Sequence, residues 1–136
     1  MKVNVFVDSS VFVEFFKGKK EAIKIIEFIA NNIEKIRVNI NAIVWSEVVY
    51  QLVIKRKFPK EDVFEFLSSL KKLEINSEVI DIAQSFVGDL YTNDALNFAS
   101  AYYFGINYFL TLDSDFKSSE DIFVIQNVES LKEIIK

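Results

Sequence analysis

The sequence contains neither cysteine nor histidine among its 136 residues. Without cysteine there can be no disulfide, no zinc–thiolate site and no thiol nucleophile. Without histidine there can be no Ser-His-Asp triad, no imidazole general base and no imidazole metal ligand. Any catalysis must therefore rely on carboxylates, hydroxyls, lysine, arginine, tyrosine or a bound metal ion.

Long apolar runs are also missing. No stretch approaches the ~20 apolar residues that a membrane-spanning helix needs. The N-terminal residues MKVNVFVDSS contain too short an apolar segment for a signal peptide and no small-residue cleavage site. We therefore expect a cytoplasmic protein without a membrane partner.

Apolar residues are abundant: they make up 51% of the chain, and 14 of them are phenylalanine. A chain of this length can bury a core as one domain, which we take to span residues 1–136. The apolar content is high for a soluble monomer. We therefore expect part of the surface to contact another chain, in a homodimer or with a partner protein.

The net charge is −4, which disfavours non-specific binding to nucleic acid, because affinity for phosphate comes from lysine and arginine. The basic residues nevertheless include two clusters. They are Lys17, Lys19 and Lys20, and Lys55, Arg56 and Lys57. Each cluster is either a solvated helix end or a contact to a substrate, and the sequence leaves both interpretations open.

Strand and helix patterns alternate along the chain. Strands are expected at residues 3–7, 37–40, 106–111 and 122–125, and helices at 9–16, 22–30, 42–55, 59–71, 78–87, 94–104 and 128–135. Helix caps are expected at Asn41, at Asn76 or Ser77, at Thr92 or Asn93, and at Asn127. The alternation predicts an α/β fold with a central parallel sheet of four to five strands, flanked by helices in three layers.

Acidic residues follow two of the predicted strands. Asp8 comes directly after the first strand, and Asp113 and Asp115 come just after the strand that ends near Thr111. Ligands of open α/β sheets bind beyond the carboxyl ends of the strands, so these carboxylates should share one rim. The alternatives are a plain helix cap for Asp8 and an acidic turn for Asp113 and Asp115.

Apolar stripes indicate which helix faces are buried. In helix 22–30 the stripe consists of Ile23, Ile26 and Ala30, and in helix 42–55 of Ile43, Tyr50 and Ile54. Glu47 lies on the second stripe, where a carboxylate is costly unless it is paired or coordinated. The alternative is that Glu47 sits at the edge of the stripe and reaches water.

A further carboxylate, Asp94, lies in the first turn of a predicted helix. The helix dipole favours a carboxylate there, so a structural role explains it adequately when it is taken alone. Asn97 lies one helical turn further along, beside Asp94, and makes this side of the helix more polar than packing requires. Asp94 and Asn97 are therefore additional candidates for the acidic rim.

Together, these carboxylates require a counter-charge. Two carboxylates ~5 Å apart repel each other by roughly 3 kcal/mol at an effective dielectric constant near 20. Oxygen ligands without histidine or cysteine select Mg²⁺ or Mn²⁺ over Zn²⁺. Mg²⁺ held by few carboxylates keeps several waters, and phosphate oxygens of a substrate can replace them.

Three segments of the sequence resemble a known family. The opening VDSSVFVEFF, the WSE of Trp45–Glu47 and the segment TNDALNFASAYYFGINYFLTLDSDF resemble PIN-domain nucleases, and in particular the VapC-type toxins of toxin–antitoxin modules. The resemblance covers essentially the whole chain in the right order. The sequence differs from many members at Asn93 and at the bulky pair Tyr102–Tyr103.

The resemblance implies a PIN-like fold in which four acidic residues bind the metal ion. They are Asp8, Glu47, Asp94 and Asp113, with Ser9 and Thr111 as neighbouring hydroxyl contacts. It also implies internal cleavage of RNA, a homodimer and inhibition by a cognate antitoxin protein. Asp115 remains a supporting residue, because it lies further from the strand and could be occupied in capping the turn.

Three other interpretations remain. A PIN-family nuclease that processes RNA outside a toxin module would share the acidic residues. A non-catalytic homologue would lack part of the acidic set, which is complete here. A phosphoacceptor receiver domain would want a second acidic residue near Asp8 and a lysine after the last strand, where this chain has Gln126 and Asn127.

Overall fold

A computed structural model describes residues 1–119 and 121–135. The elements follow one another as β1 (Val3–Val7), α1 (Ser9–Phe16), α2 (Lys20–Asn31), β2 (Ile36–Asn41), α3 (Ala42–Val49), the π-helix η1 (Tyr50–Lys55), α4 (Lys60–Ser68), β3 (Lys71–Leu73), α5 (Ser77–Gln84), α6 (Thr92–Tyr103), β4 (Tyr108–Leu110), β5 (Phe123–Ile125) and α7 (Val128–Ile134). The predicted alternation of strands and helices is therefore confirmed. None of the described helices is both long and apolar enough to cross a membrane.

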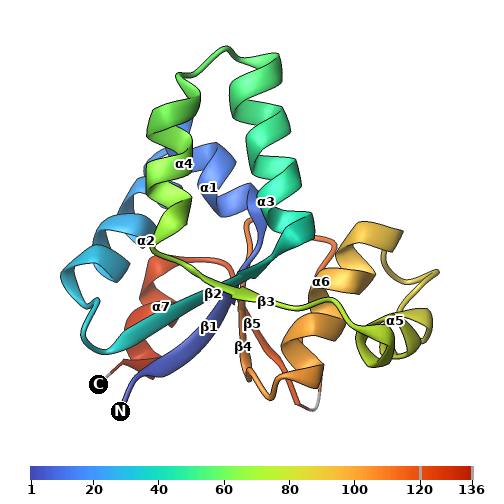
Figure 1. The fold of residues 1–136 in the computed structure, drawn as a ribbon. Helices are drawn as coiled ribbons and strands as arrows, with labels where there is room; N and C mark the ends of the chain where they lie inside the picture. Colours follow the sequence, from blue (N-terminus) through green and yellow to red (C-terminus); the bar gives the residue numbers. More distant parts are fainter. Residues whose placement is uncertain (120, 136) are drawn as a thin grey trace.

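The five strands form one parallel sheet in the order β3-β2-β1-β4-β5. Val5, Phe6 and Val7 of the central strand β1 are fully buried. Since successive side chains of a strand point to opposite faces, both faces of the sheet must be covered. Figure 1 shows the sheet in the middle of the molecule, with α2 and α7 on one side and α5 and α6 on the other in this view. The predicted α/β fold is confirmed.

The pairing of β1 with β4 brings two chain segments together at the carboxyl edge of the sheet. Phe6 and Phe109 are partners in the register, and their rings stack with centroids 5.2 Å apart. The pairing continues one residue past β1, where the amide of Asp8 donates to the carbonyl of Leu110 at 2.9 Å. As a result, Asp8 is held beside Thr111, although 103 residues separate them in the sequence.

The edge strand β3 was not predicted from the sequence. The pattern extended the preceding helix to residue 71, whereas α4 ends at Ser68 and Lys71–Leu73 pairs with β2. With only three residues and two lysines, this strand has no apolar alternation by which to recognise it. Its backbone pairs with β2 because the turn at Ser69 brings the chain alongside.

The predicted helix caps are mostly confirmed. The side chains of Asn41, Asn76 and Asn127 each accept a hydrogen bond from a backbone amide in the first turn of α3, α5 and α7. The cap predicted at Thr92 or Asn93 is wrong, because α6 begins at Thr92 and Tyr91 occupies the cap position without a side-chain bond.

The apolar rows that are buried in the structure are not the predicted ones, but lie next to them on each helix. The buried side chains of α2 are Ala22, Ile25 and Ile29, not the predicted row. Along α3 and η1 they are Val44, Val48 and Leu52, whereas Tyr50 and Ile54 are 52% and 55% exposed. Each helix carries two adjacent apolar rows, so periodicity alone cannot decide which one faces the core.

Candidate functional site

Asp8 is the most buried of the acidic residues, with an exposed fraction of 4%. It occupies the cap position of α1, but its side chain makes no cap hydrogen bond. Instead, its Oδ2 accepts from the hydroxyls of Ser10 and Thr111, both at 2.9 Å. Burial raises the pKa of Asp8, and these two hydroxyl donors act in the opposite direction. The alternative of a plain helix cap is therefore wrong.

Thr111 connects two of the predicted carboxylates. Its fully buried hydroxyl donates to Asp8 and accepts from the backbone amide of Asp113 at 3.0 Å. The hydroxyl of Ser10 accepts from the amide of Leu112 at 3.0 Å, which fixes the same loop from the other side. The sequence prediction included Thr111 but missed Ser10, because a serine after a strand is too common to be informative.

Glu47 projects from α3 toward the same rim. Its Oε1 accepts from the hydroxyl of Ser9 at 3.1 Å. Burial raises the pKa of Glu47, the charge of Asp8 raises it further, and hydrogen bonds from Ser9 and Asn93 lower it. Glu47 is thus near Asp8, as expected. It does not lie on a buried apolar stripe, however, because Tyr50 and Ile54 face solvent.

Asp94 lies in the first turn of α6, where the sequence placed it. Its pKa is raised from 3.8 to about 7, first by burial and then by the charge of Asp8. The charges of Asp113, Glu47 and Asp115 contribute further in that order. A helix dipole would lower this pKa, so the dipole alone does not account for the environment of Asp94. Four other carboxylates are near enough for their charges to raise this pKa, and this is the strongest sign of a site.

Asp113 and Asp115 make different contacts in the loop after β4. The amide of Asp115 donates to Oδ1 of Asp113 at 2.9 Å, so Asp113 caps the turn. Capping of this turn, which the sequence suggests for Asp115, is the role of Asp113 instead. Asp115 is exposed and lies further out, whereas Asp113 is partly buried.

Two buried amides and a serine complete the polar interior next to the rim. Asn97 is fully buried, and its Nδ2 lies 3.5 Å from Oδ1 of Asp8. Asn41 uses its Oδ1 to cap α3 and its Nδ2 to donate to the hydroxyl of Ser100 at 2.9 Å. The Asn41–Ser100 bond therefore ties α3, which carries Glu47, to α6, which carries Asp94. The sequence identified Asn41 as a cap but not this bridge.

The predicted basic clusters are not part of the acidic rim. Lys17 pairs with Glu14 at 3.2 Å on the exposed surface of α1. Lys55, Arg56 and Lys57 are exposed where η1 turns toward α4, and Lys57 has a positive φ of 61°. Figure 1 shows this turn at the end of the helical hairpin that lies furthest from the sheet. Their contact with RNA stays a prediction.

The donor set suits a hard cation that keeps part of its water shell. In the residues that the structure describes, no three acidic side chains converge closely enough to form a ready cage. Mg²⁺ does not need such a cage, because it keeps several waters and uses only one or two carboxylates directly. Oδ1 of Asn97 supports the fit: it is buried without a partner among the described residues, and a buried oxygen of this kind calls for a donor such as a metal-bound water.

The chain is similar to proteins of known type over nearly its whole length. The PIN domain family model matches residues 5–121. Ribonuclease VapC6 of Methanocaldococcus jannaschii is 31% identical, with 90% of this chain and 97% of that protein covered. Ribonuclease VapC2 of the same organism is 29% identical, covering 90% and 93%. A toxin–antitoxin complex from Klebsiella pneumoniae has a chain with a TM-score of 0.71 at 18% identity, covering 89% of this chain and 95% of that one, which shows a shared fold.

Proposed function

Because the chain belongs to the PIN-domain family, we propose that residues 1–136 form a single endoribonuclease domain that hydrolyses RNA with Mg²⁺ or Mn²⁺. The metal ligands in this proposal are Asp8, Glu47, Asp94 and Asp113. The observation that supports it most directly is the position of Asp94: burial raises its pKa to about 7, and the charges of four other carboxylates contribute to the rise. Two relatives that carry the name ribonuclease support the choice of RNA as substrate.

The chain's own residues prepare the site by fixing the carboxylates. Ser10 and Thr111 orient Asp8, Ser9 orients Glu47, and the turn held by Asp115 orients Asp113. A divalent cation bound there would polarise the phosphodiester and lower the pKa of an attacking water. With no histidine in the chain, the carboxylates of the site are the groups proposed to accept a proton from that water. Lysine and arginine of the two basic clusters would bind RNA phosphates away from the cleaved bond. Such contacts would position the RNA without reading its sequence.

The direct test is cleavage of a single-stranded RNA labelled at one end. With Mn²⁺ or Mg²⁺ the purified protein should produce internal cuts, and EDTA should stop them. Glu47→Gln should remove most of the activity while Glu14→Gln, on the exposed surface of α1, serves as the matched control. Cleavage that survives exhaustive chelation, or that is unchanged in Glu47→Gln, would contradict the proposed mechanism.

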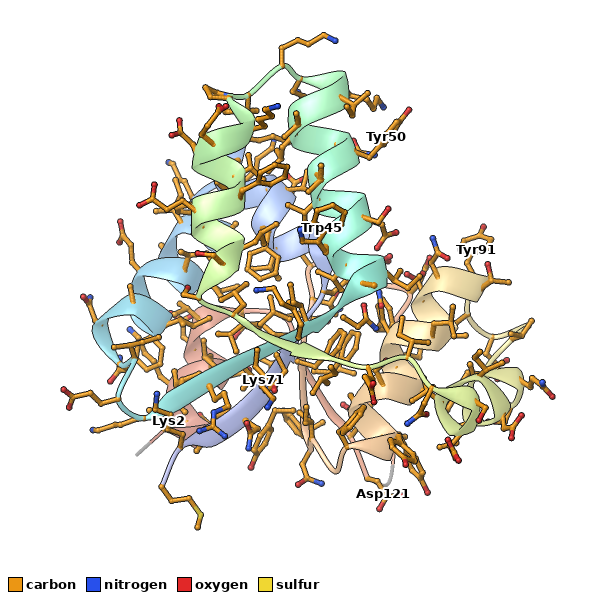
Figure 2. All side chains as sticks on the ribbon, in the orientation of Figure 1. Lys2, Trp45, Tyr50, Lys71, Tyr91 and Asp121 are labelled. Atoms are coloured by element: carbon orange, nitrogen blue, oxygen red, sulfur yellow. The ribbon has the colours of Figure 1, made fainter. Side chains whose placement is uncertain are left out.

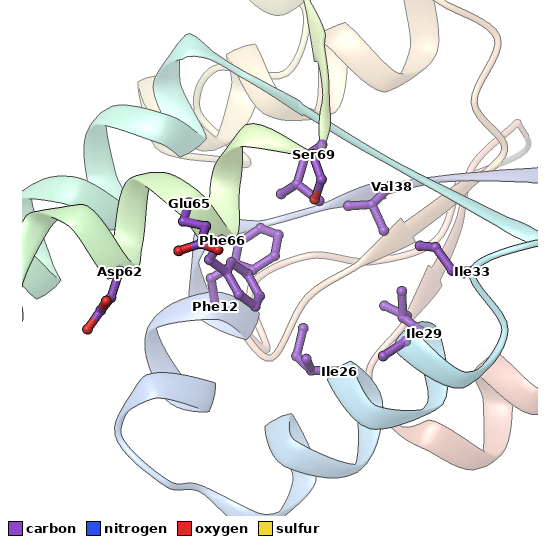
Figure 3. A pocket seen from close by; sticks show the side chains of 11 residues that line it. Phe12, Ile26, Ile29, Ile33, Val38, Asp62, Glu65, Phe66 and Ser69 are labelled. Atoms are coloured by element: carbon purple, nitrogen blue, oxygen red, sulfur yellow. The ribbon is translucent and has the colours of Figure 1, made fainter.

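We further propose that the protein acts as a toxin whose antitoxin occupies an apolar groove between α2 and α4. The groove has a volume of about 470 Å³, and its apolar walls include Ile26, Ile29 and Phe66. Asp62 and Glu65 stand at its α4 side (Figure 3). Apolar walls beside two carboxylates suit a peptide segment that alternates apolar with basic residues. The similar fold of a chain from a toxin–antitoxin complex supports a partner of this kind.

Co-purification with the protein encoded by the neighbouring gene tests the groove. Glu65→Lys should weaken the complex by reversing one charge at the groove without changing the core. Glu61→Lys makes the same charge reversal on α4 at a residue that does not line the groove, and serves as the control. If the neighbouring gene encodes no binding protein, the alternative of an RNA-processing PIN nuclease outside a toxin module is favoured.

A further inference from the structure

Two adjoining hollows lie beside the acidic rim, between the segment that joins α5 to α6 and the segment that follows β4. Their volumes are about 570 Å³ and about 620 Å³, and they share Asp89, Leu90 and Asp115. Asp115 is also one of the carboxylates that raise the pKa of Asp94, and its amide binds Asp113. The hollows therefore open directly next to the predicted metal ligands.

The wall formed by the α5–α6 connection is held by its own backbone. The amide of Leu90 donates to the carbonyl of Phe86 at 2.9 Å, and the amide of Gly88 donates to the carbonyl of Leu90 at 3.2 Å. Gly88 has a φ of +108°, which other residues rarely adopt. The connection is thus a turn fixed by backbone hydrogen bonds. Asp89 and Tyr91, which flank Leu90 in the sequence, are both exposed on it.

Aromatic side chains line the larger hollow. Phe86 and Phe98 meet edge to face with centroids 5.1 Å apart, and Phe116 packs behind them against Phe98 at 6.0 Å. Phe98 and Phe116 are each 3% exposed, so they form a rigid apolar floor. Tyr91 lines the smaller hollow and is 79% exposed; Figure 2 shows it projecting from the start of α6. An exposed aromatic ring beside a hollow is a typical stacking platform for a nucleobase.

The polar groups of the hollows are better suited to a base than to a phosphate. Asp89 and Asp115 would repel a phosphate, but each can accept two hydrogen bonds from adjacent N–H donors. Lys117 lines the same hollow and can donate to a carbonyl oxygen or a ring nitrogen. Guanine is the base that offers two adjacent N–H donors on its Watson–Crick edge and acceptors at O6 and N7, which lysine recognises.

We propose that these hollows bind an unpaired guanine base of the RNA next to the cleaved phosphodiester, with its ring against Tyr91 and its N–H edge on Asp89. The inference rests on the proposed ribonuclease function for its substrate, but base binding itself needs neither metal nor phosphate. The hollow sets which nucleotide the protein accepts beside the scissile bond, while the carboxylates of the rim bind the metal.

The test is an NMR titration of the isotope-labelled protein with guanosine, which has no phosphate, in the presence of EDTA. Guanosine should shift the amide resonances of residues 86–91 and 114–117, and uridine should bind at least about fivefold more weakly. Tyr91→Ala and Asp89→Asn should each weaken guanosine binding at least about fivefold, as expected for the loss of a stacking or edge contact. The matched controls are Tyr102→Ala, at the other end of α6, and Asp81→Asn on α5, which should bind as the unaltered protein does.

A second readout is the position of cleavage in a mixed-sequence RNA with Mn²⁺. Tyr91→Ala should raise KM and flatten the preference for guanine at one fixed position, with a smaller effect on kcat. Guanosine shifts scattered over the surface, equal binding of uridine, or unchanged binding in both variants would overturn the base pocket. Guanosine binding as expected without any RNA cleavage by the unaltered protein would uphold the base pocket and overturn the proposed function.

Discussion

Asp113 and Asp115 lie two residues apart at the same rim, but only Asp113 is tied to the buried part of the site. Its amide binds the hydroxyl of Thr111, which in turn binds Asp8. One of its oxygens accepts from Asp115, and the other is available to a cation. We therefore predict that Asp113→Asn lowers kcat/KM by more than about tenfold, since ~1.4 kcal/mol of lost transition-state stabilisation is already a factor of ten.

Asp115→Asn should have a smaller effect on kcat/KM, because only its backbone takes part in the turn. Both variants should be compared at saturating Mn²⁺, with thermal unfolding curves to confirm that they are folded. A folded Asp115→Asn protein that is less active than Asp113→Asn would show that the fourth ligand has been assigned to the wrong residue.

Asp94 makes the stability of the metal-free protein depend on pH. Its pKa of about 7 in the folded state lies above the ordinary value of 3.8, so between these values the folded state holds a proton that the unfolded state has released. The contribution of Asp94 to the free energy of unfolding should therefore be highest below about pH 4 and should be lost as the pH rises to about 7. Asp8 and Glu47, whose pKa values are also raised, act in the same direction.

Denaturant unfolding in EDTA at about pH 5 and about pH 7.5 measures this loss. Asp94→Asn should make the two values more similar, while Asp81→Asn, an exposed residue of α5, should leave the difference unchanged. Mn²⁺ should reverse the trend, because its binding requires deprotonated carboxylates. A free energy of unfolding that rises with pH in EDTA would contradict the burial of Asp94 beside the other carboxylates.

The sequence predicts the carboxylates of the candidate site more fully than the groups that hold them. The position after a buried strand points to Asp8 and Asp113, and the resemblance to the family adds Glu47 and Asp94. Serine and asparagine are common in turns and caps, so the roles of Ser10 and Ser100 could not be predicted. Their partners lie 102 and 59 residues away in the sequence, respectively, and only the fold brings them together.

At the scale of the elements, the separation of α3 and α6 decides whether Glu47 and Asp94 can share a cation. Asn41 and Ser100 are both fully buried and join the two helices by one hydrogen bond of 2.9 Å. Ser100→Ala would leave the Nδ2 of Asn41 without this partner, at a cost of about 1–3 kcal/mol in the free energy of unfolding. The affinity for Mn²⁺ should fall as well, since the two helices lose their tie.

Calorimetric titration with Mn²⁺ and denaturant unfolding should therefore both change in Ser100→Ala. Ser85→Ala is the matched control: its hydroxyl donates to the backbone carbonyl of Ile82, as the hydroxyl of Ser100 donates to that of Leu96, but on the exposed surface next to α5. An unaltered Mn²⁺ affinity in Ser100→Ala would mean that the bond stabilises the fold without positioning the ligands.

The elements themselves were predictable where local patterns are strong. Long buried strands and asparagine caps are local signals, and β1 and the caps of α3, α5 and α7 were predicted correctly. The strand β3 and the buried rows of α2 and α3 were not, because they depend on what the chain packs against. The π-helix η1 continues α3 without a break in the sequence pattern, so its change of helix type could not be recognised either.

At the scale of the whole molecule, the apolar excess of the chain remains partly on the surface. Trp45, Tyr50, Ile54 and Phe64 have exposed fractions of 41%, 52%, 55% and 42%. The rings of Trp45 and Phe64 stack with centroids 6.2 Å apart, and Figure 2 shows Trp45 and Tyr50 on the helix formed by α3 and η1. Tyr50 and Ile54 lie four residues apart on η1 and expose more apolar surface than a monomer needs, and we predict that this pair, the η1 cluster, forms the centre of a homodimer interface.

Light scattering coupled to size exclusion should show a dimer at micromolar protein concentration. Ile54→Lys adds a charge to the cluster at a position that is already exposed, so it should shift the protein toward monomer without unfolding it. Ile80→Lys, at a residue of α5 that is 47% exposed, introduces the same charge elsewhere and should leave the dimer intact.

Because Glu47 lies on the same helical segment as Tyr50, a dimer built on this cluster would also hold α3 in place. Ile54→Lys should then lose some affinity for Mn²⁺, whereas Ile80→Lys should not. A protein that is monomeric throughout, or a dimer that Ile54→Lys leaves unchanged, would show that this cluster is not the interface.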